Sequence, residues 1–192
     1  WMKAASGVIH SEMPKQQFGL MRGFQLWINL PAVNKMDPPE YMEYTEEMFP
    51  VVKFPNYTVK VLVGHFDGID APIIDSVTEV TYLDVQLQPK KDFRYDLPKG
   101  NSNFIYVFEG YGTLAGQAVS HHSLAIPGLS DNGSITFLAG NRGARFIVVS
   151  GKPIHEPIVR YGPFVMSTKE QIDQAMKDFQ SNQFIRERAW VK

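Results

Sequence analysis

The chain has 192 residues, of which 44% are hydrophobic and 20% charged, and its formal net charge is −1. This length allows one large or two small domains with a core of reasonable size. The near-neutral charge gives no electrostatic field that would attract nucleic acid or an anionic membrane. The absence of cysteine excludes disulfides and thiolate metal sites. No apolar run reaches the length of a membrane span, and no signal-peptide pattern is present.

The most informative stretch comes first and reads Gly7-Val8-Ile9-His10-Ser11-Glu12-Met13-Pro14. It is typical of a short strand after a glycine turn, and alternation along a strand would place His10 and Glu12 on the same face. A neutral imidazole and a carboxylate form one half of a site suited to iron, nickel, manganese or zinc. The alternative is a polar strand end that faces solvent, because His-x-Glu is also common by chance.

Alternating apolar residues predict further strands along the chain. They are expected at residues 20–30, 58–64, 77–87, 103–109, 119–126, 134–138 and 143–150, with a shorter strand around 93–95. Residues 34–50 are rich in acids and proline, which predicts a connector with one helical turn near residues 40–47. Short strands separated by glycine and proline turns favour an all-β barrel or sandwich.

The end of the chain has a different pattern. Ser167-Thr168-Lys169-Glu170 has the spacing of a capping box, in which side chains satisfy the free backbone groups of a helix start. Apolar residues follow at helical spacing, so the sequence predicts one amphipathic C-terminal helix.

Two segments share the same pattern of a glycine, three residues, a predicted strand and a proline, which suggests an internal repeat. Gly7-Val8-Ile9-His10 and Gly143-Ala144-Arg145-Phe146 each lead through a predicted strand to a proline. If this correspondence is real, the chain holds the end of one barrel and the whole of a second. Phe146 then stands where the first copy has His10, so the second barrel would lack that ligand.

A Gly-x-x-His motif that closes a β-barrel resembles the second half of the cupin signature, and the longer motifs resemble the pirin family. They occur in order along nearly the whole chain: Trp1-Met2, Gly7 to Pro14, Gln25 to Ala32, Lys35-Met36, Pro98-Lys99-Gly100 followed by Phe104-Ile105-Tyr106, and Gly162 to Met166.

The resemblance implies an all-β bicupin of two antiparallel, jelly-roll-type β-barrels with a C-terminal α-helix. We therefore expect residues 1–50 to be the remainder of an N-terminal cupin domain with its connector. Residues 51–166 would form the C-terminal cupin domain, and residues 167–192 the helix and tail.

The resemblance also implies a metal site. In the pirin family three histidines and one glutamate hold one iron, and two of those histidines lie in a His-x-His-Arg-Gly motif. His10 and Glu12 match the other two ligands, whereas the first motif is absent from this sequence. We therefore expect an incomplete first barrel, with Fe(II) or another divalent metal bound only if the full-length protein supplies the missing histidines. The start at Trp1 favours a missing front of the first cupin over a removed leader peptide.

Three functions follow from the resemblance. The first is quercetin 2,3-dioxygenase activity, the oxygen-dependent opening of a small aromatic flavonol, with His10 and Glu12 as metal ligands and Glu12 as the catalytic base. The second is an iron-dependent redox sensor that modulates transcription through a protein partner. The third is a metal-free truncated scaffold. In each case we expect no direct nucleic acid or membrane contact, and a cytoplasmic location, or a nuclear one if the source is eukaryotic.

The remaining histidines are weaker candidates for a site. His121 and His122 would face opposite sides of their predicted strand, so at most one could point into a barrel, and a surface pair is the alternative. His65 and His155 are expected to be structural or exposed.

The second barrel is expected to be metal-free. Aligning it on the first places Asp96, Pro98 and Phe146 at the positions of the family's histidines. Near the half-site, Phe18, Phe24 and Trp27 could line an apolar pocket for an aromatic ligand, and core packing explains them equally well.

Overall fold

The computed structural model describes residues 1–13, 18–127 and 133–191, so Pro14 of the first motif lies outside it. The chain forms two compact units, Trp1–Glu43 with Ile154–Lys192, and Tyr44–Pro153. Residues 154–166 therefore cluster with the N-terminal segment and the terminal helix. The division into a domain of residues 51–166 flanked by residues 1–50 and 167–192 stays a prediction.

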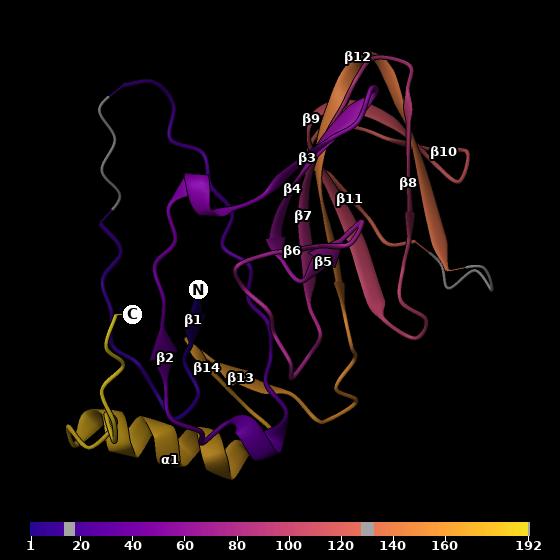
Figure 1. The fold of residues 1–192 in the computed structure, drawn as a ribbon. Helices are drawn as coiled ribbons and strands as arrows, with labels where there is room; N and C mark the ends of the chain where they lie inside the picture. Colours follow the sequence, from indigo (N-terminus) through magenta and orange to yellow (C-terminus); the bar gives the residue numbers. More distant parts are fainter. Residues whose placement is uncertain (14–17, 128–132, 192) are drawn as a thin grey trace. The chain divides into compact units, whose positions relative to one another are not determined.

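The second unit is built on one antiparallel sheet (Figure 1). Its strands are β3 (Val51–Lys53), β4 (Tyr57–Val63), β7 (Thr81–Leu87), β8 (Asp92–Asp96), β9 (Ser102–Leu114), β10 (Gln117–Val119), β11 (Ser123–Ala125) and β12 (Ser134–Gly151). The order is β10-β9-β12-β7-β4-β3, with β8 paired to β12 and β11 to β9. A separate hairpin joins β5 (His65–Phe66) to β6 (Ile69–Asp70), and a 3₁₀ helix spans Glu46–Met48.

The core of this unit follows from alternation along the strands. In β4 and β7 every second residue is buried, including Val59, Val61 and Leu83. Phe146 of β12 is fully buried among the core aromatics. The predicted all-β class and the C-terminal helix are confirmed. The sheet is a barrel only in a loose sense, because the strand order of the described residues does not close into a ring.

One long strand replaces two predicted ones. β12 runs unbroken over the residues predicted as strands 134–138 and 143–150. A register shift against β9 between Ala139 and Ala144 lets the chain bend without ending the strand. Gly143 lies in this bend at φ +78°, where a Cβ would approach the Leu87 carbonyl oxygen to 2.7 Å, so only glycine fits.

Two other predicted strands are cut short by turns. β7 starts at Thr81 rather than Val77, because the Asp75 carboxylate accepts hydrogen bonds from the backbone N–H groups of Val77 and Thr78, each at 3.1 Å. The predicted strand over residues 119–126 is interrupted by a turn in which His122 has φ +59°. Alternation alone does not reveal such side-chain hydrogen bonds.

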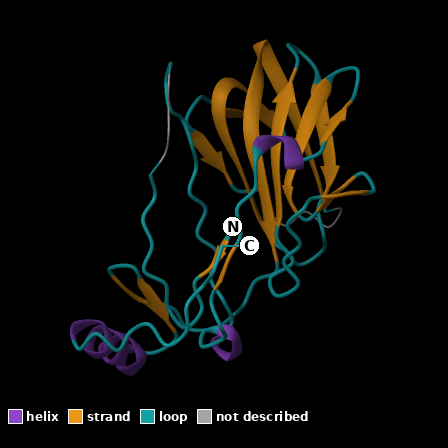
Figure 2. Ribbon diagram, turned by 60° about the vertical axis from the view of Figure 1, so that its left-hand side comes forward, coloured by secondary structure: helices purple, strands orange, loops and turns teal. Residues whose placement is uncertain are grey.

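The first unit is mostly irregular chain (Figure 2). Its elements are β1 (Met2–Lys3), β2 (Glu40–Tyr41), β13 (Val159–Tyr161), β14 (Phe164–Met166), the 3₁₀ helix Ala32–Asn34 and α1 (Lys169–Gln180). β1 pairs with β2 and β13 with β14, both antiparallel. The strands predicted at residues 7–12 and 20–30 are wrong, since neither segment pairs with a strand of the described chain. A strand exists only where a neighbour accepts its backbone hydrogen bonds.

The terminal helix starts one residue later than its predicted capping box. The Thr168 hydroxyl accepts from the Gln171 backbone N–H, and the Gln171 side chain accepts from the Thr168 N–H at 3.0 Å. Ile172 and Ala175 form the buried stripe of α1, as the apolar spacing predicts. Among the described residues no helix is both long and apolar enough to cross a membrane.

Candidate metal site

The segment that carries His10 and Glu12 is tied down at its start. β1 pairs with β2, and the Ser6 N–H donates to the Asp37 carbonyl oxygen at 3.1 Å. The Asp37 carboxylate accepts from the Lys3 ammonium at 2.8 Å and from the Asn34 amide at 3.0 Å. These two hydrogen bonds, with the Lys3 bond the stronger influence, lower the pKa of Asp37. The approach to the half-site is therefore fixed by pairing with residues 34–42.

Gly7 has a specific reason to be glycine. Its φ is +131°, and a Cβ there would lie 2.7 Å from the ring of Phe184. That ring also packs edge-on against Phe164 and Phe179, at centroid distances of 5.3 and 5.9 Å. The glycine of the Gly-x-x-His motif thus lets an aromatic cluster of the C-terminal region close on the backbone. The sequence pattern indicated a turn here and gave no sign of Phe184.

His10 and Glu12 themselves are exposed. The Gln25 amide Nε2 donates to Glu12 Oε1 at 3.0 Å. The His10 ring lies 6.5 Å from the Tyr41 ring, centroid to centroid. Among the described residues no strand pairs with residues 7–12. The placement of His10 and Glu12 on one face of the chain therefore stays a prediction. Gln25 was part of a motif in the sequence, and only the structure brings it to Glu12.

The donor types of this pair fit a divalent metal, but two donors do not complete a coordination shell. Within the described chain no group of three or more His, Cys, Asp or Glu side chains is arranged to hold a metal ion. His10 and Glu12 therefore fit one half of a metal site. The other ligands would have to come from further residues of the full-length protein. Gln25 fits the role of a hydrogen-bonded outer partner that orients a ligating carboxylate.

A buried lysine supports the same unit. Lys35 is only 6% exposed, and its ammonium donates to Asn29 Oδ1 at 2.6 Å and to the Val165 carbonyl oxygen at 3.2 Å. Burial lowers the pKa of Lys35, and the charge of Glu156 opposes this in part. Glu156 in turn accepts from the Ala32 N–H at 2.6 Å. These contacts join the loop around residues 29–35 to β14 and its approach.

The other histidines are surface residues. His121 and His122 stack on each other with 3.7 Å between ring centroids, and His121 Nε2 lies 2.8 Å from the Phe108 carbonyl oxygen. They occupy a turn and not a strand, so the predicted opposite orientation is wrong and the surface alternative is correct. His65 is exposed beside Asp70, with 2.5 Å between His65 Nδ1 and Asp70 Oδ1, and His155 is exposed too.

The ligand positions of the second barrel carry packing residues or surface residues. Phe146 is 0% exposed and lies 4.5 Å from the Phe137 ring and 5.7 Å from the Phe93 ring. Asp96 and Pro98 are both exposed. Of the three aligned positions only Phe146 packs among aromatic rings, and a metal-free second barrel stays a prediction.

The three aromatic residues that follow the half-site in the sequence are exposed. Phe18 is 92% exposed, Trp27 62% and Phe24 43%. Core packing does not account for such exposure. Whether they enclose an aromatic ligand stays a prediction.

An antiparallel sheet wrapped around an apolar core, together with a Gly-x-x-His segment and a carboxylate two residues later, defines a cupin-type protein. The family model of the pirin C-terminal cupin domain matches residues 82–185, and the pirin model matches residues 1–28. The chain belongs to the pirin family.

Individual relatives agree with this assignment. The chain is 44% identical over 185 residues to a Pseudomonas aeruginosa protein whose name assigns it provisionally as a quercetin 2,3-dioxygenase, covering 93% of this chain and 65% of that protein. It is 36% identical over 185 residues to Pirin-1 of Arabidopsis thaliana, covering 94% and 63%. The chain thus spans less than two thirds of the length of these curated relatives.

A solved structure is similar as well. The crystal structure of a quercetin 2,3-dioxygenase from Acinetobacter baumannii matches with a TM-score of 0.75 and 27% identity. The match covers 82% of this chain and 55% of that one. The likeness extends well beyond the sheet of the second unit.

Proposed function

We propose that this chain is the part of a pirin-like metalloprotein that carries His10 and Glu12 as two of the metal ligands. The complete protein would act as a quercetin 2,3-dioxygenase. The observation that carries this proposal is the exposed donor pair, with Glu12 oriented by Gln25. The names of the Pseudomonas aeruginosa and Acinetobacter baumannii relatives support the choice of reaction.

Each residue has a defined role in this proposal. His10 supplies a neutral nitrogen and Glu12 an anionic oxygen to the metal. His10 and Glu12 would hold this metal together with the missing ligands, and it would supply Lewis-acid chemistry toward the flavonol 3-hydroxyl and oxygen. The Glu12 carboxylate would take the proton of that hydroxyl. The hydrogen bond from Gln25 would keep the Glu12 carboxylate oriented.

The test restores a complete ligand set. The N-terminal part of the Pseudomonas aeruginosa relative is joined in front of this chain, and the chimera is loaded anaerobically with Fe(II), Ni(II) or Mn(II). On admission of oxygen we expect quercetin to disappear and carbon monoxide to be released. The His10→Ala chimera should bind metal more weakly and turn over no quercetin. A metal-loaded chimera that leaves quercetin intact and releases no carbon monoxide would refute the activity.

A second readout concerns Gln25. The chimera with Gln25→Ala should bind the metal about tenfold more weakly, which is at the low end of the effect of removing an outer-shell partner. Gln117→Ala is the matched control, because Gln117 is also an exposed glutamine but lies in β10 of the other unit. This change should leave the metal affinity unchanged.

The exposed half-site favours one alternative, a metal-free scaffold. Two solvated donors without a third partner in the described chain make a weak chelate. If the scaffold alternative holds, replacing both His10 and Glu12 with alanine changes neither metal content nor any activity of the chimera. Redox sensing through a protein partner stays a prediction from the resemblance.

A further inference from the structure

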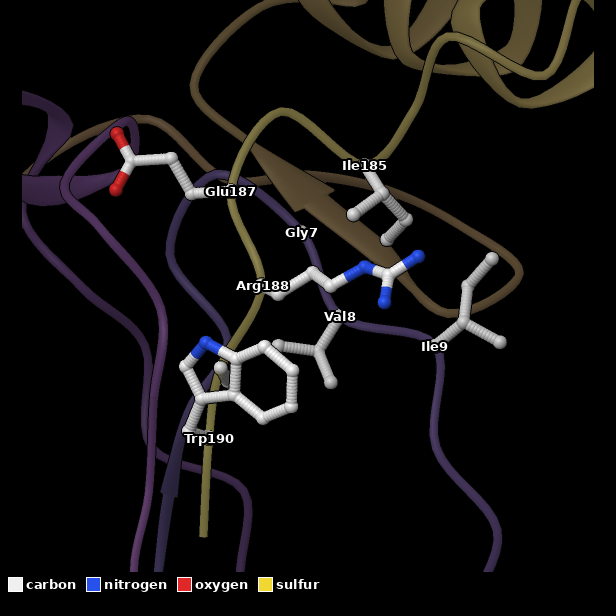
Figure 3. A pocket seen from close by; sticks show the side chains of 8 residues that line it. Gly7, Val8, Ile9, Ile185, Glu187, Arg188 and Trp190 are labelled. Carbon is white, nitrogen blue, oxygen red and sulfur yellow. The ribbon is translucent and has the colours of Figure 1, made fainter. Parts of the chain in front are cut away.

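A pocket lies next to the half-site in the sequence, within the first unit. The segment around Gly7 and the C-terminal tail enclose a pocket of about 250 Å³. Val8, Ile9, Ile185 and Trp190 form its apolar wall, and two charged residues, Glu187 and Arg188, also line it (Figure 3). The pocket thus combines an apolar wall with one indole ring, one guanidinium and, at its edge, the Glu187 carboxylate.

The guanidinium of Arg188 points into this pocket. In Figure 3 it lies among the side chains of Val8, Ile9 and Ile185, while the neighbouring carboxylate of Glu187 points away from them. Arg188 has no hydrogen-bond or ion-pair partner within the described parts of the chain. Arg186, two residues earlier, differs, because its guanidinium pairs with Asp178 at 3.3 Å.

An unpaired cation on an apolar surface defines the ligand chemistry. A guanidinium binds a carboxylate with two parallel N–H donors, and this geometry is better satisfied by a carboxylate than by a neutral group. The flat indole of Trp190 and the branched side chains of Val8 and Ile9 offer contact to a ring. A volume of about 250 Å³ accommodates one or two fused rings and excludes a long peptide.

We propose that this pocket binds a small aromatic carboxylate, with the carboxylate on Arg188 and the ring between Val8, Ile9 and Trp190. This site is separate from the proposed metal chemistry, because it uses neither His10 nor Glu12. It is open to solvent on one side, since Ile9 is 66% exposed and Trp190 72%, so we expect weak binding with a dissociation constant on the order of 1 mM.

The test uses 6-fluoro-2-naphthoate and the neutral 6-fluoro-2-naphthamide as probes, followed by ¹⁹F NMR with EDTA present to remove metal. The naphthoate signal should broaden and shift saturably, and the amide should bind about tenfold more weakly or worse. Arg188→Gln should weaken naphthoate binding by about tenfold or more, as expected for loss of a charged hydrogen bond. The matched control Arg186→Gln removes a charge that is already paired and should leave naphthoate binding unchanged.

Trp190→Ala provides a second, independent variant and should also weaken naphthoate binding, while the far-ultraviolet circular dichroism stays that of the wild type. The proposal is overturned if naphthoate shows no saturable binding at ten times the expected dissociation constant. It is equally overturned if the Arg188→Gln variant binds naphthoate as tightly as the wild type does. The same holds if the wild type binds the naphthamide as tightly as the naphthoate. His10→Ala should leave naphthoate binding unchanged, so failure here is distinguishable from failure of the dioxygenase proposal.

Discussion

The two glycine-led segments of the chain make an informative comparison. Gly143 to Phe146 lies inside β12, hydrogen-bonded to β7 and β9, and its aromatic residue is fully buried. Gly7 to His10 has no strand neighbour in the described chain, and its histidine is exposed. The same pattern is therefore a packing element in one place and a solvated half-site in the other. The difference lies in the last residue, Phe146 against His10, and in the strands that surround one segment and not the other.

The largest expected effect comes from the last residue of each segment. Phe146→Ala should lower the free energy of unfolding by about 3–5 kcal/mol, because it empties the space between the Phe93 and Phe137 rings. His10→Ala should change it by less than about 0.5 kcal/mol, since an exposed side chain loses few contacts. Urea unfolding followed by circular dichroism measures both. Equal costs at the two positions would break the comparison.

The next effect concerns the glycine at the start of the exposed segment. Gly7→Ala should cost about 1–3 kcal/mol, because its Cβ would overlap the Phe184 ring and the backbone has φ +131°. Gly23→Ala is the matched control, as nothing lies within 4 Å of a Cβ there. Thermal unfolding of the two variants measures the difference. If Gly7→Ala is as stable as Gly23→Ala, the aromatic contact does not anchor the segment.

Lys35 tests whether the first unit depends on buried polar contacts where the second depends on aromatic packing. Lys35→Met should cost about 1–3 kcal/mol, because Asn29 Oδ1 and the Val165 carbonyl oxygen lose their donor. The exposed Lys169→Met change is the control and should cost much less.

The same residue predicts a pH dependence. Because burial lowers the pKa of Lys35 in the folded protein, the unfolded chain binds more protons between that lowered value and the ordinary lysine pKa. Over that interval the wild type should gain stability relative to Lys35→Met as the pH rises. Urea unfolding at a series of pH values measures this, and a difference that falls with pH would contradict the assignment.

The smallest effect is at Asp37, which ties the start of the exposed segment to residues 34–42. Its pKa is lowered by the hydrogen bonds from Lys3 and Asn34, so its contribution is present above the ordinary aspartate pKa and is lost as the pH falls through the lowered value. The melting temperature of Asp37→Asn should therefore lie slightly below that of the wild type at pH 7 and approach it in acid. A gap that widens in acid would contradict this account.

Much of the fold could be predicted from local patterns. Alternation identified β4, β8 and β9, and apolar spacing identified α1, because these elements pack one face on a core and so show the period of their structure in the sequence. The strand predicted at residues 20–30 has the same alternation and does not form. Alternation reflects only the local sequence, whereas a strand also needs a neighbouring strand that accepts its backbone hydrogen bonds.

The sequence by itself determined the family and the two donor types at His10 and Glu12, because these depend only on residue identity and order. Only the tertiary structure decided that Gln25 reaches Glu12, that Phe184 closes on Gly7, and that Arg188 lies beside Val8 and Ile9. Each of these contacts joins residues far apart in the chain. No local periodicity records such contacts, since they arise when separate segments pack together.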